Sequence, residues 1–227
     1  MNIVPIRTVR TGALRDAQQG TARRWSTVND MEVAAAYDDS EAARLAEAGL
    51  GDLGFRRRVG VKGRGARAWL QALGVATPEH PNHWLRLPCG SVVARLGDTE
   101  FVVASAGDVR LVESITAAAP AHGVYPVPRF DADLLLAGRR ASELLAQTCA
   151  FHFGALDAAA QPLVMTSMVG VAVTVLVLPG LDGTSYRLWC DGTYGGYLWR
   201  MLAAIAVELG GGPVGLESLE SLGSLVR

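Results

Sequence analysis

The order of strand-like and helix-like segments repeats within the chain, and this repeat limits the possible folds more than any other feature. The first copy is predicted to run strand, helix, two hairpin strands, helix and strand, over residues 55–61, 66–73, 91–96, 100–105, 108–118 and 124–129. The second copy follows the same order, over residues 132–137, 141–147, 169–178, 185–190 and 194–209, with a short last strand. Each copy therefore reads β-α-β-β-α-β, the order of a ferredoxin-like unit.

A few residues also match between the copies. The first strand–helix junctions align Gly63 with Gly138, and the second hairpin strands align Phe101 with Tyr186. We therefore predict an α+β fold with an internal duplication. Each half has an open sheet face, so the two halves can bury these faces together and leave a cavity or groove between them. The predicted organisation is an irregular N-terminal arm, a first half and a second half, over residues 1–30, 31–129 and 130–227.

Charge and cysteine content exclude several classes of protein. The net charge is −1 with both signs mixed along the chain, which gives no field to hold nucleic acid or an anionic membrane. The three cysteines form no C-x-x-C pair, and the N-terminus lacks the apolar core of a signal peptide. The most apolar stretch, residues 163–178, is shorter than the roughly 20 residues of a membrane helix. We expect a soluble, cytoplasmic protein with no nucleic-acid or membrane partner.

Six basic residues lie close together in the first half of the sequence. They are Arg56, Arg57, Arg58, Lys62, Arg64 and Arg67. One interpretation is a solvated strand edge followed by the start of a helix. The other is a patch for an anionic ligand or for an acidic partner.

Motifs for common chemistries are absent. The chain has no glycine-rich phosphate loop and no G-x-S-x-G nucleophile turn. His80 and His83 lie in a proline-rich loop without a helix to align them, so we expect no metal site. Cys149 and His152 lack a visible third group and an oxyanion hole, so we expect no catalytic residues.

Aromatic and arginine side chains concentrate in the strand–turn–helix segment over residues 186–200. Aromatic walls with a few placed polar groups suit a planar heterocycle. The alternative is that these aromatics are core residues of the sheet and the helix. The candidate ligand-binding residues are Tyr186, Arg187, Trp189, Tyr197, Trp199 and Arg200.

Several segments, taken in order, resemble the folate-binding aminomethyltransferase superfamily, which includes the glycine cleavage T-protein and the YgfZ-type proteins. They read AEAGLGDLGF, VGVKGRGA and RLGDTEFVV at residues 46–55, 59–66 and 95–103. In the second half, LAQTC at 145–149 and YLW at 197–199 are most similar to the gamma subunit of heterotetrameric sarcosine oxidase. The resemblance covers residues 32–209 and implies a duplicated β-α-β-β-α-β fold.

The sequence departs from this superfamily where the catalytic acids are expected. The stretch at residues 86–93, RLPCGSVV, has no carboxylate where the transferases have an acidic strand. The turn at residues 192–196, GTYGG, has no acid after its tyrosine, whereas the transferases have a glutamate that contacts folate. The sequence therefore offers no evident residue to act as the general acid or base in the transfer. The YgfZ-type motif is also absent.

The resemblance implies an accessory, gamma-like subunit of a sarcosine-oxidase-type complex. Such complexes oxidise an N-methyl amine with a flavin on partner flavoprotein subunits and can pass the one-carbon unit to tetrahydrofolate. The arm and the basic residues would contact the large subunit. An alternative is a stand-alone tetrahydrofolate-dependent transferase, with folate between the halves against the four candidate aromatics and its glutamate tail on Arg187 or Arg200. A third is a regulatory or scaffold domain that has lost folate binding.

Overall fold

Two β-sheets form the centre of the protein, and the computed structural model describes residues 9–180 and 183–223. The first sheet has five strands in the order β5-β6-β7-β4-β8. Their bounds are His83–Arg86, Val92–Arg95, Glu100–Ala104, Arg58–Lys62 and Tyr125–Pro128. The second sheet has six strands in the order β10-β11-β12-β9-β3-β13. Their bounds are Leu163–Met168, Val171–Gly180, Gly183–Cys190, Ala132–Ala137, Gly49–Asp52 and Gly212–Pro213.

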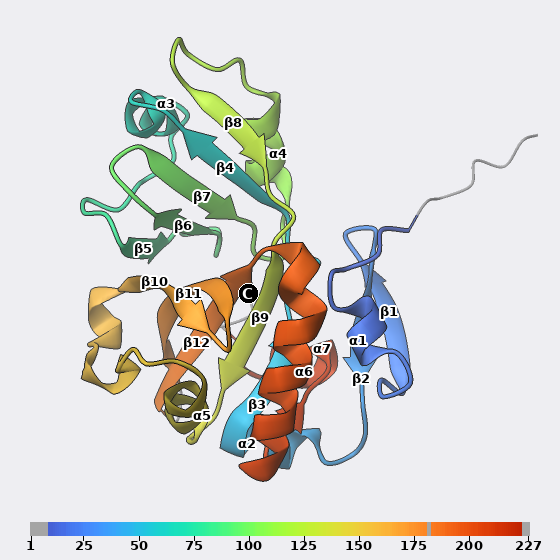
Figure 1. The fold of residues 1–227 in the computed structure, drawn as a ribbon. Coiled ribbons are helices and arrows are strands. Elements are labelled where there is room, and N and C mark those ends of the chain that lie inside the picture. The colour runs from blue at the N-terminus through green and yellow to red at the C-terminus, as the bar shows by residue number, and fades with distance from the viewer. Residues whose placement is uncertain (1–8, 181–182, 224–227) are drawn as a thin grey trace, which may run out of the picture.

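Helices cover the outer face of each sheet, and the inner faces of the two sheets pack against each other. Helices α3 (Ala66–Ala72) and α4 (Arg110–Ala117) share a buried cluster with the first sheet. Helices α5 (Ala141–Thr148) and α6 (Gly192–Glu208) do the same with the second. A third buried cluster joins residues of both sheets. The layers therefore run helix, sheet, sheet, helix, with the first sheet in the upper part of Figure 1.

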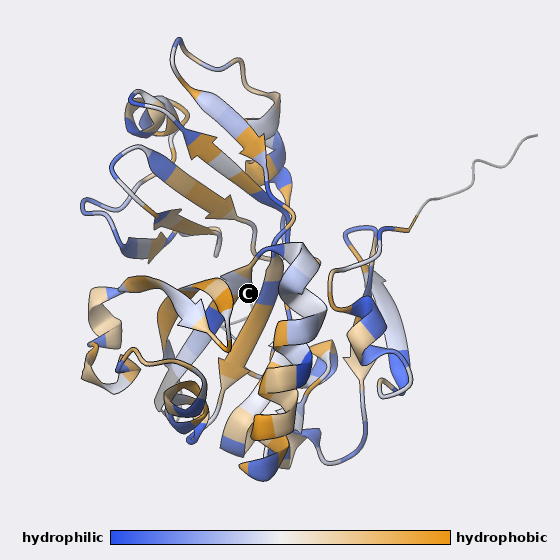
Figure 2. Cartoon of the chain, viewed as in Figure 1, coloured by the Kyte–Doolittle hydropathy of each residue, from blue (hydrophilic) through white to orange (hydrophobic). Residues whose placement is uncertain are grey.

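Period-two alternation along the strands creates these layers. In β7, Phe101 and Val103 face the helices, whereas Val102 and Ala104 face the opposite sheet. Apolar residues on both faces are the pattern of a strand that is covered on both sides. Figure 2 shows the same hydrophobic colour along the central strands of both sheets. The mixed α+β class predicted from the sequence is confirmed.

The first strand–helix turn has the same backbone in both halves. Gly63 and Gly138 each have φ of +117°, which disfavours any residue with a side chain. A Cβ on Gly63 would lie 1.9 Å from the carbonyl oxygen of Gly123, and one on Gly138 would lie 2.5 Å from that of Glu47. The two aligned glycines are therefore required by close backbone approach as well as by φ.

The structure adds strands that the sequence pattern missed. Strands β5 and β10 lie at the edges of their sheets, and backbone hydrogen bonds join their ends, from Trp84 N to Gln161 O and from Leu163 N to Asn82 O. Residues 49–52, which the sequence assigned to the first half without a strand, form β3, which pairs with β9 and β13 in the second sheet. Local patterns could not show this, because its partners lie more than 80 residues away in the sequence.

The N-terminal region is folded, where an irregular arm was expected. Within residues 9–30, the structure has helix α1 (Arg15–Gln18) and strand β1 (Arg24–Val28), which pairs with β2 (Met31–Ala36). The buried side chain of Leu14 joins the core of the second sheet, and Gln18 Nε2 donates to Asp52 Oδ2 at 3.1 Å. We call residues 9–36 the N-terminal hairpin unit.

Four shorter elements complete the order. Helix α2 (Glu41–Ala48) leads into β3, and α7 (Leu216–Glu220) follows β13. Two 3₁₀ turns lie between α5 and β10. Among the described residues, no helix combines the length and hydrophobicity that a bilayer crossing requires.

Candidate functional site

A buried ion cluster links the two sheets in the inter-sheet layer. Asp133 of β9 is bound by Arg187 of β12, with Nε to Oδ1 at 2.8 Å, and by Arg58 of β4, with a terminal nitrogen to Oδ2 at 2.5 Å. The exposed fraction of each side chain is 2% or less. Alternation along the strands explains this position, because these residues share the inner faces with the third buried cluster.

Burial and opposite charge compete within this cluster. Burial alone would raise the pKa of Asp133, but the guanidinium groups of Arg187 and Arg58 outweigh it and hold that pKa below its ordinary value. Burial lowers the pKa of Arg58. Burial and then the charge of Arg187 lower the pKa of Arg56 to about 9. The inter-sheet layer therefore holds an unusual amount of buried positive charge.

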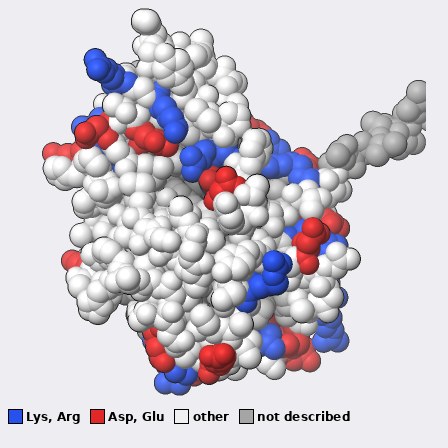
Figure 3. All heavy atoms as spheres, in the orientation of Figure 1, with Lys and Arg blue, Asp and Glu red and all other residues white. Residues whose placement is uncertain are grey.

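A cavity of about 640 Å³ lies beside this cluster. One wall is the N-terminal hairpin unit at residues 10–13 and Met31, and the others are α4, the start of β4, and β8 with residues 129–131. Arg56 and Arg58 line it too, so the cavity borders the ion cluster. Basic side chains gather where the five-stranded sheet meets the hairpin unit (Figure 3). A volume of roughly 300–1,000 Å³ is typical of ligand sites.

The charged groups of this cavity differ in how firmly they are paired. Arg129 forms a bidentate ion pair with Asp131, with both distances 2.9 Å. Terminal nitrogens of Arg57 lie 3.7 Å from a carboxylate oxygen of Glu113 and 3.9 Å from one of Asp30, and both distances are too long for a hydrogen bond. Buried Nε atoms of Arg57 and Arg58 have no hydrogen-bond partner within the part of the chain that the structure describes. The partly exposed terminal nitrogens of Arg57 are therefore the guanidinium donors that remain available in the cavity.

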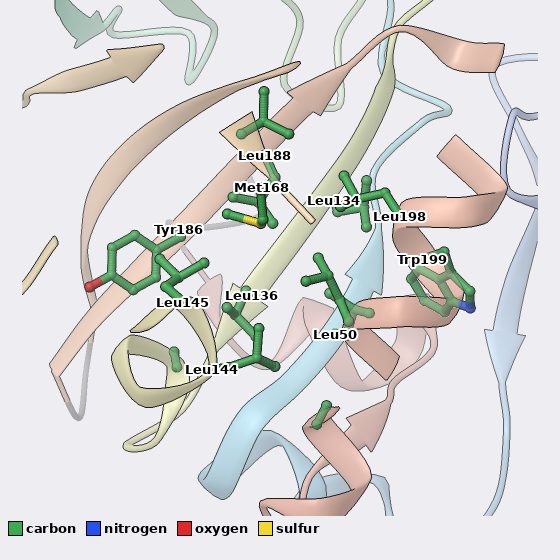
Figure 4. Packing of buried hydrophobic residues seen from close by; sticks show 14 of the residues in the cluster. Leu50, Leu134, Leu136, Leu144, Leu145, Met168, Tyr186, Leu188, Leu198 and Trp199 are labelled. Atoms are coloured by element: carbon green, nitrogen blue, oxygen red, sulfur yellow. The ribbon is translucent and has the colours of Figure 1, made fainter. Parts of the chain in front are cut away.

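The six candidate ligand-binding residues do not lie together. Tyr186 and Trp199 belong to the core between the second sheet and its helices, where Figure 4 shows them apart with leucines between them. Tyr186 also pairs with Ser142, hydroxyl to hydroxyl at 2.7 Å. Arg187 and Trp189 face the other way, into the inter-sheet layer, because neighbouring strand residues alternate. Four of the six are thus almost fully buried.

The other two candidates lie on the outer face of α6. Tyr197 is 43% exposed and donates to the carbonyl oxygen of Val169 at 3.2 Å, and Arg200 is exposed. Their binding to folate, and that of the four buried residues, stays a prediction. The structure places all six outside the lining of the cavity.

Two features of the site were not predicted, or were predicted only in part, from the sequence. Of the six basic residues, Arg56 and Arg58 are buried, so they are neither a solvated edge nor a surface for a partner. Asp133 stands within the apolar strand ADLLLA, and a lone acid in such a strand could have indicated a buried ion pair. No group of three or more His, Cys, Asp or Glu in residues 9–180 and 183–223 could hold a metal ion.

Comparison with solved structures places this architecture among known folds. A glycine cleavage system aminomethyltransferase T from Bartonella henselae superposes with a TM-score of 0.72 at 16% identity over 94% of this chain. This is the aminomethyltransferase fold. The chain spans 62% of that enzyme's length.

A second structure resembles this chain more closely in length. It is a heterotetrameric sarcosine oxidase from Corynebacterium sp. U-96 in complex with pyrrole 2-carboxylate, with a TM-score of 0.61 at 20% identity. The match covers 76% of this chain and 93% of the matched chain. No protein-family model and no curated protein matches the sequence. The fold implied by the predicted superfamily is therefore confirmed.

Proposed function

We propose that this chain is a non-catalytic, gamma-like subunit of a sarcosine-oxidase-type complex that oxidises an N-methyl amine and passes the one-carbon unit to tetrahydrofolate. The observation that carries the proposal is the filled inter-sheet layer. The space where a ligand between the halves would lie is occupied by an apolar cluster and by the Asp133 ion cluster. The chemistry would then reside on partner subunits, which would also hold the flavin.

The absence of an acid at the expected position supports the same proposal. The inner face of β6 carries Val92 and Ala94, which belong to the apolar inter-sheet cluster. The superfamily resemblance leads one to expect a carboxylate on this strand. Without it, no group at this position could move a proton on a substrate amine or on a folate nitrogen. The structural match to one chain of a heterotetramer also favours a subunit role.

The outer face of α6 is a suitable contact surface for a partner. Tyr194, Tyr197, Met201 and Val207 on this helix are between 37% and 60% exposed. Large exposed apolar groups that gather on one helix are typical of interaction surfaces. Tyr197 and Arg200 would then contact the partner. The expected cytoplasmic location fits, because it would keep the three cysteines reduced.

The resemblance between the halves supports a finer statement on the fold. We infer that they are duplicated ferredoxin-like units. The first sheet has β8-β4-β7-β6 in the order of such a unit. The second has the corresponding β9-β12-β11, with β3 between β9 and β13. The shared conformation of Gly63 and Gly138 marks the same turn in both.

An affinity purification of the tagged full-length chain from its native host tests the subunit proposal. We expect yellow partner chains in fixed stoichiometry, identified by mass spectrometry and by flavin absorbance. Replacing Tyr194 and Tyr197 together by alanine should reduce their recovery. The matched control is Tyr125→Ala, because Tyr125 is 63% exposed but lies on β8. A colourless chain without partners that binds 5-formyl-tetrahydrofolate would overturn the proposal in favour of the stand-alone transferase.

A further inference from the structure

We propose that the cavity between the N-terminal hairpin unit and the first sheet binds an organic monocarboxylate with an apolar body. This inference does not depend on the subunit proposal, because the cavity is formed by this chain alone. It rests on the cavity's size, on its apolar walls and on guanidinium donors that remain available at its border with the ion cluster.

The anionic end of the ligand is indicated by Arg57. The terminal nitrogens of its neighbour Arg58 already bind Asp133 and the carbonyl oxygen of Asp131. The side chain of Arg57 is 35% exposed, and its terminal nitrogens lie 3.7 Å from Glu113 and 3.9 Å from Asp30, so they can donate to a ligand carboxylate. Charge-assisted N–H to carboxylate bonds are also the stronger kind.

Five arginines and two carboxylates line the cavity, and the position of Glu113 beside Arg57 favours a single negative charge at that end of the ligand. Asp131 is held by Arg129 in a bidentate pair, so neither group changes the charge of the cavity. Glu113 lines the cavity and lies 3.7 Å from Arg57. A dianion would be repelled by this carboxylate, whereas a monoanion can compete with it for the guanidinium of Arg57.

The apolar part of the ligand is indicated by the remaining walls. Val112 and Ala117 of α4 line the cavity together with Val127 of β8. The ring of Phe130 also lines it and is 74% exposed. Covering this ring would remove apolar surface from water, which favours binding. A purely polar anion would not gain this contribution.

Binding of anilinonaphthalene sulfonate, an aromatic monoanion, to the full-length chain provides the test. We expect saturable fluorescence enhancement with one site per chain. Decanoate should displace the probe, whereas decanol, which lacks the charge, and inorganic phosphate, which lacks the apolar part, should displace it at least tenfold less well. Equal displacement by decanoate and decanol, or no binding of the probe, would overturn the proposal.

Substitutions of opposite sign separate a binding site from general damage to the fold. Arg57→Gln should weaken decanoate binding by about tenfold or more, the equivalent of one charge-assisted hydrogen bond. Glu113→Gln should strengthen it by roughly threefold, because the competing carboxylate is removed. Both residues are partly exposed, so both variants should fold. Arg110→Gln, an exposed arginine on the same helix as Glu113 and outside the lining, should change nothing.

Filling the cavity gives a separate control on location. Ala117 is exposed and lines the cavity, so Ala117→Trp should abolish binding of the probe without disturbing the core. Ser114→Trp places the same bulk on the same helix outside the lining and should bind as the unchanged chain does. Unaltered binding by Ala117→Trp would show that the probe lies elsewhere and would overturn the assignment.

Discussion

Arg187 in the inter-sheet layer and Arg57 at the cavity show two ways in which one chain holds a guanidinium group. Arg187 is almost fully buried and forms two hydrogen bonds with Asp133, which Arg58 also binds. Arg57 has an exposed fraction of 35% and only distant carboxylates. The first arrangement is closed and fixes the positions of three strands. The second leaves donors available to a ligand. Arg57 and Arg58 are neighbours in the sequence but differ in this way, so proximity of arginines in the sequence says little about their role.

The largest effect should come from opening the closed cluster. Asp133→Ala leaves two buried guanidinium groups without their carboxylate and should lower the free energy of unfolding by about 3–5 kcal/mol. Urea unfolding followed by circular dichroism measures this change. Asp108→Asn removes an acid from an exposed pair with Arg110 and should leave the urea midpoint unchanged. Similar losses in both variants would mean that the Asp133 cluster contributes no more to stability than an exposed ion pair.

An intermediate effect is expected at Asp52, where the N-terminal hairpin unit packs on the second sheet. Burial raises the pKa of Asp52 to about 6. Hydrogen bonds from the N–H of Gly54 and from the side chain of Gln18 lower this pKa and so offset part of the effect. Between its ordinary value of 3.8 and about 6, the folded protein therefore keeps a proton that the unfolded chain has released. Stability contributed by this group is fully present below pH 4 and is lost as the pH rises to 6.

Asp52→Asn should remove this pH dependence and raise the free energy of unfolding at pH 7 by roughly 1–3 kcal/mol. The Oε1 of Gln18 has no partner among the described residues, so an amide flip lets it accept from the new asparagine. Urea unfolding at a series of pH values from 4 to 7 measures both effects. An unchanged slope in this window would show that Asp52 does not titrate there.

The smallest effect on stability is expected at Arg57 itself. Its ion pairs are long and half-exposed, so Arg57→Gln should change the free energy of unfolding by about 0.5 kcal/mol or less. The same urea series measures it. A loss comparable to that of Asp133→Ala would mean that Arg57 belongs to the closed cluster and is not available to a ligand.

Much of the fold could be predicted from local patterns. The hairpin of β6 and β7 has turn residues between two β-branched runs, and α6 begins where Asp191 accepts a hydrogen bond from the N–H of Thr193. Strand β5 was missed because it lies among prolines in a stretch that reads as a loop. Strand β3 was missed because its pairing depends on distant segments.

The candidate site was harder to predict, for a geometric reason. Tyr186 and Arg187 are neighbours in the sequence, yet a strand directs them to opposite faces of its sheet, one to α5 and one to Asp133. The aromatic residues that are concentrated in this part of the sequence therefore lie in two separate layers of the structure. The cavity is formed by the N-terminal hairpin unit, α4 and β8. Some of these segments lie 90 or more residues apart in the sequence, so no local motif marks the cavity.

The position of β3 limits the order in which the protein can form during synthesis. Residues 49–52 leave the ribosome early, but their neighbours in the sheet are residues 132–137 and 212–213. The first sheet can pair all of its strands once residue 128 has emerged. Strand β3 has no partner until those later strands have been synthesised. Until then, the backbone N–H and C=O groups along both of its edges can pair with other chains. A nascent fragment that ends near residue 129 should therefore hold one finished sheet and one exposed strand, which is a substrate for chaperones.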